Sequence, residues 1–246
     1  MEEYFVVADI AGQFDALQRL VKRVPETTPI ILVGDLVDRG HESYEVVDWA
    51  MKTPRVTSLL GNHEHMMWDY YTNYGSKTFY DDIEGQPCWL YCGQNGNNGG
   101  GATRASYSRN GFKRPPQEHL DWIISRPLHF QTEDKKMVVT HAPILAGETL
   151  ESALQKTAEF VKNGGYRHAD GSLIWNRTPP THKPYLQIFG HNSYWGLQPF
   201  YSKDDEAVGD IYALCIDQSG KGILTGFHWP TYEILEEHYL ASDNPK

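Results

Sequence analysis

The sequence has few cysteines and no long apolar run. Its three cysteines among 246 residues, Cys88, Cys92 and Cys215, are too few for a disulfide scaffold and are typical of a reducing compartment. No apolar run approaches the roughly 20 residues that a membrane-spanning helix needs. The first residues also lack the positive charge of a signal peptide. These absences exclude a secreted disulfide miniprotein and a membrane protein, and we expect a cytoplasmic protein.

Basic residues are also scarce. The 22 Lys and Arg residues against 32 Asp and Glu residues give a formal net charge of -10. This acidic excess argues against broad nucleic-acid binding, which depends on neutralising phosphates. Hydrophobic residues make up 40% of the chain and charged residues 22%, an ordinary globular composition that excludes a largely disordered protein. With no repeat and no obvious linker, we predict one domain over residues 1–246; the oligomeric state stays open.

Predicted strands and helices alternate along the first part of the chain. Short apolar runs rich in β-branched residues predict strands, and apolar residues at helical spacing predict helices. The predicted strands cover residues 4–8, 29–33, 55–60, 137–140 and 185–189, with further strands over 210–236, and the predicted helices cover 14–24, 44–51, 115–124 and 150–161. This alternation predicts a mixed α/β fold with a βαβαβ core.

Residues from about 70 to 114, here named the 70–114 excursion, show no sustained period and are rich in Tyr, Asn and Gly. We predict an irregular segment at the substrate rim, because long irregular stretches in compact domains usually serve function. Its aromatic residues, including Trp89 and Tyr107, are expected mainly to pack the excursion itself. Cys88 and Cys92 lack a second cysteine pair and are not expected to bind zinc.

Five apolar runs end on side chains that are able to bind a metal: Asp9, Asp35, Asn62, His141 and His191. Open α/β sheets place their sites at the carboxyl ends of strands. A single such Asp is commonly a turn residue, but five such ends together favour a metal cluster. Carboxylate, amide and imidazole ligands without thiolate suit Mn²⁺, Fe or Zn²⁺. A pair of such ions would serve in-line displacement at phosphorus.

Several short segments resemble signatures of the calcineurin-like metallophosphoesterases and, more narrowly, of the PPP-type serine/threonine protein phosphatases. The segments are Asp9-Ile10-Ala11-Gly12, Gly34 to Gly40, Gly61 to Glu64, Thr140-His141-Ala142 and Gly190-His191-Asn192, with Trp175-Asn176-Arg177 resembling bacterial and phage members. The resemblance covers most of the chain. It implies a central two-layer β-sandwich of mixed sheets flanked by helices.

The resemblance also implies which residues would hold two divalent ions, with Mn²⁺ the expected metal. Asp9 would bind the first ion and Asp35 would bridge both. Asn62, His141 and His191 would hold the second. The implied function is hydrolysis of phosphomonoesters, either on phosphoserine or phosphothreonine of a protein or on small phosphoesters, by in-line attack of a metal-activated hydroxide.

The remaining family roles fall on residues that would contact the substrate. By position, His63 would be the general acid that protonates the leaving group, oriented by Asp38. Arg39 and Arg177 would bind the phosphate. The chemistry fits these types, because a carboxylate partner fixes the tautomer of an imidazole and a guanidinium matches phosphate oxygens bidentately.

One position departs from the family pattern. The first signature of the family has a histidine, a ligand of the first metal, where this sequence has Ala11. Alanine has no ligand atom, so we predict a weakened or empty first site and an impaired enzyme. Ala11 is either a laboratory substitution or the mark of a natural degenerate member. The intact remainder of the motif set favours the laboratory substitution.

Three other functions stay open at this point. A dinucleoside polyphosphate hydrolase would share the first three signatures, and the aromatic 70–114 excursion would then stack a base. A phosphodiesterase would act on a less charged phosphoryl group. A non-catalytic module would bind phosphate through Arg39 and Arg177, but it would not need the His63–Asp38 pair. The other histidines, His65 among them, are expected to be structural.

Overall fold

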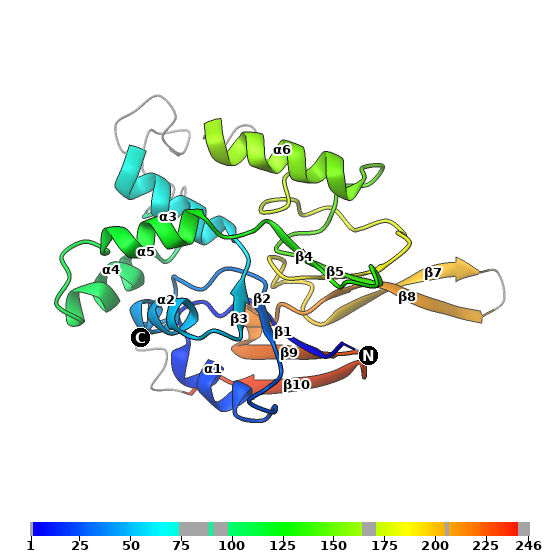
Figure 1. Ribbon diagram of the computed structural model, residues 1–246, viewed down its shortest axis with the longest axis horizontal. Coiled ribbons are helices and arrows are strands. Elements are labelled where there is room, and N and C mark those ends of the chain that lie inside the picture. Colours follow the sequence, from blue (N-terminus) through cyan, green and yellow to red (C-terminus); the bar gives the residue numbers. More distant parts are fainter. Residues whose placement is uncertain (1, 74–88, 91–97, 164–170, 205–206, 241–246) are drawn as a thin grey trace.

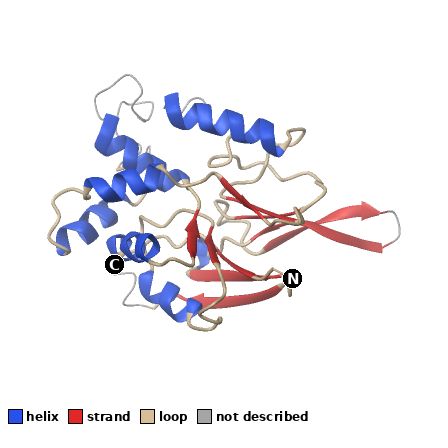
Figure 2. Cartoon of the chain, viewed as in Figure 1, coloured by secondary structure: helices blue, strands red, loops and turns tan. Residues whose placement is uncertain are grey.

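The computed structural model describes residues 2–73, 89–90, 98–163, 171–204 and 207–240. In these residues two five-stranded sheets form the centre and helices surround them (Figures 1 and 2). The helices are α1 (Phe14–Val21), α2 (Ser43–Lys52), α3 (Asn62–Asn73), α4 (Gly100–Arg109), α5 (Gln117–Ile124) and α6 (Leu150–Asn163). None of these described helices is both long and apolar enough to cross a membrane.

The first sheet has the strand order β10-β9-β1-β2-β3. Its strands are β1 (Tyr4–Val7), β2 (Ile30–Leu32), β3 (Val56–Ser58), β9 (Ile223–Trp229) and β10 (Glu233–His238). Strands β1, β2 and β3 run parallel, and β9 pairs antiparallel with β1. Parallel neighbours need a crossover connection, which α1 and α2 supply. The carboxyl ends of the three parallel strands therefore lie at one edge of the sheet.

The second sheet has the strand order β4-β5-β6-β8-β7. Its strands are β4 (His129–Gln131), β5 (Met137–Thr140), β6 (Leu186–Phe189), β7 (Gln198–Asp204) and β8 (Ala207–Cys215). Strands β5, β6 and β8 are parallel, while β4 and β7 are antiparallel edge strands. Both sheets are thus mixed, as the family resemblance implied.

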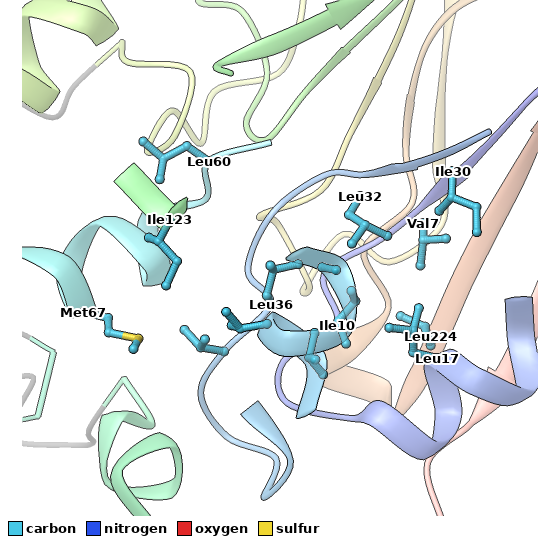
Figure 3. Close-up of a cluster of buried hydrophobic side chains, with 14 of the residues drawn as sticks. Val7, Ile10, Leu17, Ile30, Leu32, Leu36, Leu60, Met67, Ile123 and Leu224 are labelled. Carbon is cyan, nitrogen blue, oxygen red and sulfur yellow. The ribbon is translucent and has the colours of Figure 1, made fainter. Parts of the chain in front are cut away.

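Alternate residues of the same strands belong to two different hydrophobic cores. On β1, Phe5 and Val7 face α1 and α2, while Val6 packs between the two sheets. The next strand repeats this pattern, with Ile30 and Leu32 on the helix side. Successive side chains of a strand point to opposite faces, so buried strands need apolar residues at every position. Figure 3 shows part of the helix-side core, which joins residues of β1 and β2 to α1.

Most predicted elements are confirmed to within a few residues, but the prediction of an irregular 70–114 excursion is wrong in part. Helix α3 continues to Asn73, and residues 100–109 form α4. Helix α4 has a weak sequence pattern and is held by tertiary packing instead: Tyr107 is buried against Tyr44, with their ring centroids 5.4 Å apart. Cys88, Cys92 and the glycine-rich residues 93–97 lie outside the described residues.

Candidate metal centre and active site

The five predicted metal-binding side chains come together where the two sheets meet. Asp9, Asp35 and Asn62 follow the carboxyl ends of β1, β2 and β3 in the first sheet. His141 and His191 follow β5 and β6 in the second sheet. All five residues are buried, with exposed fractions of 5% or less.

The ligand atoms predicted for the second metal converge on one point. Asn62 Oδ1 lies 2.9 Å from His141 Nε2 and 2.9 Å from His191 Nδ1. Asp35 Oδ1 lies 3.4 Å from the same nitrogen of His141. Among the described residues, one group of His, Cys, Asp and Glu side chains lies close enough to share an ion, and it consists of Asp35, His141 and His191.

The protonation state of these groups fits a cation. His141 Nδ1 lies 3.0 Å from the carbonyl oxygen of Val33, so this nitrogen must carry the proton that it donates. His141 Nε2 then turns its lone pair toward the amide oxygen of Asn62, and two acceptors face each other. Burial lowers the pKa of His141 and of His191, which favours the neutral, ligating imidazole. A divalent ion between these atoms would accept a lone pair from each of them.

The first metal position keeps two of its expected ligands, Asp9 and Asp35. Both carboxylate oxygens of Asp9 accept the backbone N–H of His191, at 3.1 and 3.0 Å. Burial raises the pKa of Asp9, as do the nearby charges of Asp217 and Asp35. Asp217 follows β8 but is not among the predicted metal ligands. The sequence predicts strands over 210–236 without indicating where each strand ends, so it does not single out this carboxylate. A concentration of buried carboxylates with little compensating positive charge fits a cation site.

The backbone at Ala11 lies in the left-handed region. Ala11 is buried and has a φ of 51°. Residues other than glycine rarely have a backbone in this left-handed region, although histidine is found there more often than most. Asp35, Asp38, Arg39 and His191 also have positive φ values. Strained backbone of this kind concentrates at functional sites, where the surrounding structure holds it in place.

His63 and Asp38 form the predicted pair beside these ligands. His63 Nδ1 lies 2.6 Å from Asp38 Oδ2, so Nδ1 donates to the carboxylate. His63 Nε2 lies 3.2 Å from Nη2 of Arg39, which has protons only to donate. In this arrangement His63 is neutral, with its Nε2 lone pair facing the guanidinium. The same Nε2 is 3.7 Å from Asp35, which places the imidazole at the metal ligands.

Arg39 and Arg177 lie on the exposed side of the buried ligands. Nη1 of Arg177 donates to the carbonyl oxygen of His191 at 3.2 Å and contacts Oδ1 of Asn192 at 3.4 Å. The adjacent Trp175 ring lies edge-on to His191, with ring centroids 5.8 Å apart. Arg39 thus contacts His63 and Arg177 contacts the His191 segment, and the binding of phosphate by both guanidinium groups stays a prediction.

Glu64 holds the loop that carries Asp35. Its carboxylate accepts the backbone N–H groups of Asp35 at 2.7 Å, Leu36 at 2.7 Å, Val37 at 3.2 Å and Gly61 at 3.1 Å. A Cβ on Gly61 would collide with the backbone and carboxylate of Asp35, so this approach requires glycine. The sequence pattern marked Glu64 only as the end of a signature, whereas the structure shows what it does.

Replacing Glu64 by Gln should lower the free energy of unfolding by about 3 kcal/mol, because the N–H₂ of the amide would face backbone N–H groups that then lose their acceptor oxygen. Urea denaturation at pH 7 measures the change. Glu118→Gln, at an exposed position on α5, is the matched control and should change stability by less than about 0.5 kcal/mol. Equal effects of the two substitutions would contradict this role of Glu64.

His65 is structural, as the sequence predicted. It is buried on α3, stacked on Trp68 with ring centroids 6.1 Å apart and tilted toward Phe160 at 5.2 Å. Burial lowers the pKa of His65 to about 4. The unfolded chain, where the pKa is about 6.5, therefore takes up the proton first as the pH falls. Stability linked to His65 is present above pH 6.5 and is lost between about pH 6.5 and 4.

Between pH 7 and pH 4.5, the free energy of unfolding of the native chain should therefore fall by about 2 kcal/mol more than that of His65→Gln, with both proteins free of metal. Urea denaturation of both chains at the two pH values, in a chelating buffer, measures this difference. The comparison concerns the pH dependence and not the absolute stability, so packing lost in the variant does not affect it. Parallel pH profiles for the two chains would show that His65 takes up its proton equally in both states.

Comparison with known proteins agrees with this geometry. Residues 4–205 match the family model of the calcineurin-like phosphoesterases. The chain is 30% identical over 160 residues to a symmetrical bis(5'-nucleosyl)-tetraphosphatase of Vibrio parahaemolyticus, a match that covers 63% of this chain and 50% of that protein. The chain spans about half the length of the curated relatives that it matches.

Solved structures share the fold at low identity. A cold-active protein-tyrosine phosphatase of a psychrophilic Shewanella has a TM-score of 0.58 and 16% identity, over 97% of this chain and 78% of that chain. A serine/threonine phosphatase from Saccharomyces cerevisiae has a TM-score of 0.53 and 16% identity, over 100% and 82%. Because the family model spans most of the chain and these structures share its two-sheet fold, this chain belongs to the calcineurin-like phosphoesterases, a family of hydrolases that bind divalent metals.

Proposed function

We propose that this chain hydrolyses phosphomonoesters of proteins or small molecules, using divalent ions, Mn²⁺ first among them. The observation that carries the proposal is the convergence of Asn62 Oδ1, His141 Nε2 and His191 Nδ1 at 2.9 Å, beside the His63–Asp38 pair. Asp35 and these three residues would hold one ion, and Asp9 with Asp35 would hold another weakly. Bound ions supply an activated water and offset the charge on the phosphoryl oxygens.

The chain's own residues then bind the substrate and transfer the proton. Arg39 and Arg177 would bind the phosphoryl oxygens. Arg39 now donates toward His63 Nε2 at 3.2 Å, so a bound phosphate that attracts Arg39 would free this nitrogen. His63, once protonated at Nε2, would give that proton to the leaving alkoxide. Asp38 would hold Nδ1 and stabilise the imidazolium.

Hydrolysis of p-nitrophenyl phosphate with Mn²⁺, Fe²⁺ or Zn²⁺ tests the proposal. The chain should be active with at least one of these ions, and His141→Ala should remove both the activity and the ion bound most tightly. Ion content is measured by mass spectrometry on desalted protein. A chain that binds the ion but hydrolyses no ester, even with Ala11→His, would instead support a phosphate-binding module.

A second candidate is cleavage of dinucleoside polyphosphates. The curated relatives named above favour it, because they are symmetrical bis(5'-nucleosyl)-tetraphosphatases. Tyr194 offers a supporting feature: it follows His191 by three residues and has an exposed fraction of 64%. Its ring lies edge-on to Trp195, with centroids 5.7 Å apart, and its free face would stack a base.

Product analysis with diadenosine tetraphosphate separates the two candidates. Symmetrical cleavage yields ADP alone, whereas other cleavage yields AMP and ATP. Tyr194→Ala should raise KM for this substrate about tenfold and leave p-nitrophenyl phosphate hydrolysis unchanged, since stacking one base is worth about 1–3 kcal/mol. Equal KM values for the native chain and the variant would show that Tyr194 does not bind the nucleotide. If no ADP forms, only the phosphomonoesterase proposal stands.

A further inference from the structure

The carboxylate of Asp38 is held by more than its histidine. His63 Nδ1 donates to Oδ2 at 2.6 Å, and Thr103 Oγ1 donates to Oδ1 at 2.6 Å. The indole N–H of Trp89 points between both oxygens, with Nε1 3.0 and 2.9 Å away. Asp38, Trp89 and Thr103 are all buried. A carboxylate removed from water needs such donors, so three side chains together determine its position.

Thr103 fixes the backbone of Asp38 as well as its carboxylate. The backbone N–H of Asp38 donates to Thr103 Oγ1 at 2.9 Å and to Ser43 Oγ at 3.1 Å. The two hydroxyls lie 3.0 Å apart. Because the Thr103 hydroxyl already donates its proton to Asp38, the Ser43 hydroxyl must be the donor to Thr103 Oγ1. Asp38 has a φ of 77°, a strained value that requires this support.

Both holding residues come from the 70–114 excursion. Trp89 is one of its described residues, and Thr103 lies on α4. Gly99 packs tightly on the Asp38 loop: a Cβ on Gly99, which has a φ of 97°, would lie 2.5 Å from the backbone nitrogen of Arg39. A Cβ on Gly100 would lie 2.7 Å from the Trp89 ring. Helix α4 and Trp89 thus pack against each other and against the Asp38 loop.

We propose that Trp89 and Thr103 are positioning residues for the His63–Asp38 pair. They hold the Asp38 carboxylate so that His63 presents Nε2 to the leaving-group oxygen. The inference rests on the proposed role of His63 as general acid. Proton transfer needs heavy atoms within about 2.6–3.2 Å, and a misplacement of about 1 Å costs about 100-fold in rate. Trp89 and Thr103 would therefore govern leaving-group protonation.

Packing alone does not explain the contact of Trp89. Its ring lies 5.2 Å from the ring of Tyr70 and 5.5 Å from that of Tyr71, and a phenylalanine would satisfy these contacts. The indole N–H adds a donor that only Asp38 uses in the described residues. Trp89→Phe keeps an aromatic ring and removes this donor. Thr103→Val removes the hydroxyl at nearly constant volume, and Thr103→Ser restores it.

The leaving group of the substrate reveals a positioning role. Phenyl phosphate has a poor leaving group that needs protonation, whereas 2,4-dinitrophenyl phosphate has one that hardly needs it. With Mn²⁺, Thr103→Val and Trp89→Phe should lower kcat for phenyl phosphate about tenfold or more and for the dinitrophenyl ester less than about threefold. KM and Mn²⁺ content should not change, and Thr103→Ser should recover most of the rate. Equal losses on both esters would overturn the inference.

A second measurement does not depend on turnover. In protein with ¹⁵N-labelled histidine, the Nδ1 proton of His63, identified by its loss in His63→Gln, should be protected from exchange by the bond to Asp38. Thr103→Val and Trp89→Phe should shift or broaden this resonance, and Thr103→Ser should not. An unchanged resonance in both variants would overturn the positioning role. If no form of the chain hydrolyses any ester, the proposed function fails, and this spectrum still decides whether Trp89 and Thr103 position the His63–Asp38 pair.

Discussion

Replacing Ala11 by histidine should raise the number of Mn²⁺ ions bound per chain from one to two and increase kcat for p-nitrophenyl phosphate at least about 100-fold. Changes to groups that merely support metal ligands alter affinity or activity about 10–100-fold, so a direct ligand should do at least as much. The left-handed backbone at Ala11, with its φ of 51°, suits histidine. The imidazole would join Asp9 and Asp35. Metal content by mass spectrometry and the hydrolysis rate measure the two effects separately.

The control is Ala11→Phe, which adds a ring of similar size without a ligand atom. It should leave one ion per chain, because Asn62, His141 and His191 are untouched, and it should not raise the rate. If Ala11→His folds, keeps the first-bound ion and gains no second one, the first metal site predicted from Asp9 is wrong. If it gains a second ion without activity, the ions have a binding or structural role.

Replacing His63 by Gln should lower kcat about 100- to 10,000-fold while leaving KM and the bound metal unchanged, because general acid catalysis typically contributes this much. His63 contacts Asp38 and Arg39, and its Nε2 lies 3.7 Å from Asp35, so its loss removes a proton donor but not a metal ligand. Steady-state kinetics with phenyl phosphate and metal analysis of the same preparation measure both quantities.

His141→Ala is the contrasting variant, since it should release the ion along with the activity. His228→Gln is the neutral control: His228 pairs with Glu3 at the amino end of β1, away from the metal ligands. A loss below about tenfold for His63→Gln would assign proton donation to another group, and a loss of metal would place His63 among the ligands.

Much of the fold and the site could be predicted from local sequence. The apolar runs ending in Asp9, Asp35 and Asn62 identify buried parallel strands, because only continuous apolar residues suit strands covered on both faces. Those strands were predicted to within a few residues. The metal-binding side chains follow directly, since the carboxyl ends of parallel strands share one edge. The missing ligand at Ala11, by contrast, follows from the resemblance to the first signature of the family.

Other features depend on residues that are distant in the sequence. Helix α4 has no clear apolar period and is stabilised by the packing of Tyr107 against Tyr44 on α2. Three of the four backbone N–H groups that donate to Glu64 come from the segment after β2, and the fourth, that of Gly61, comes from the segment after β3. Sequence periodicity does not predict such contacts.

The sequence by itself therefore determined the types of the metal-binding side chains and their places at the ends of the predicted strands, because these are properties of local patterns. Its resemblance to the family indicated the missing histidine at position 11. Only the tertiary structure decided what holds the reactive groups in place. Trp89, expected from its type to serve packing, donates its N–H to Asp38 together with Thr103. These hydrogen bonds join Asp38 to residues that lie 51 and 65 positions away in the sequence. Only the folded backbone sets the distance and direction of such bonds.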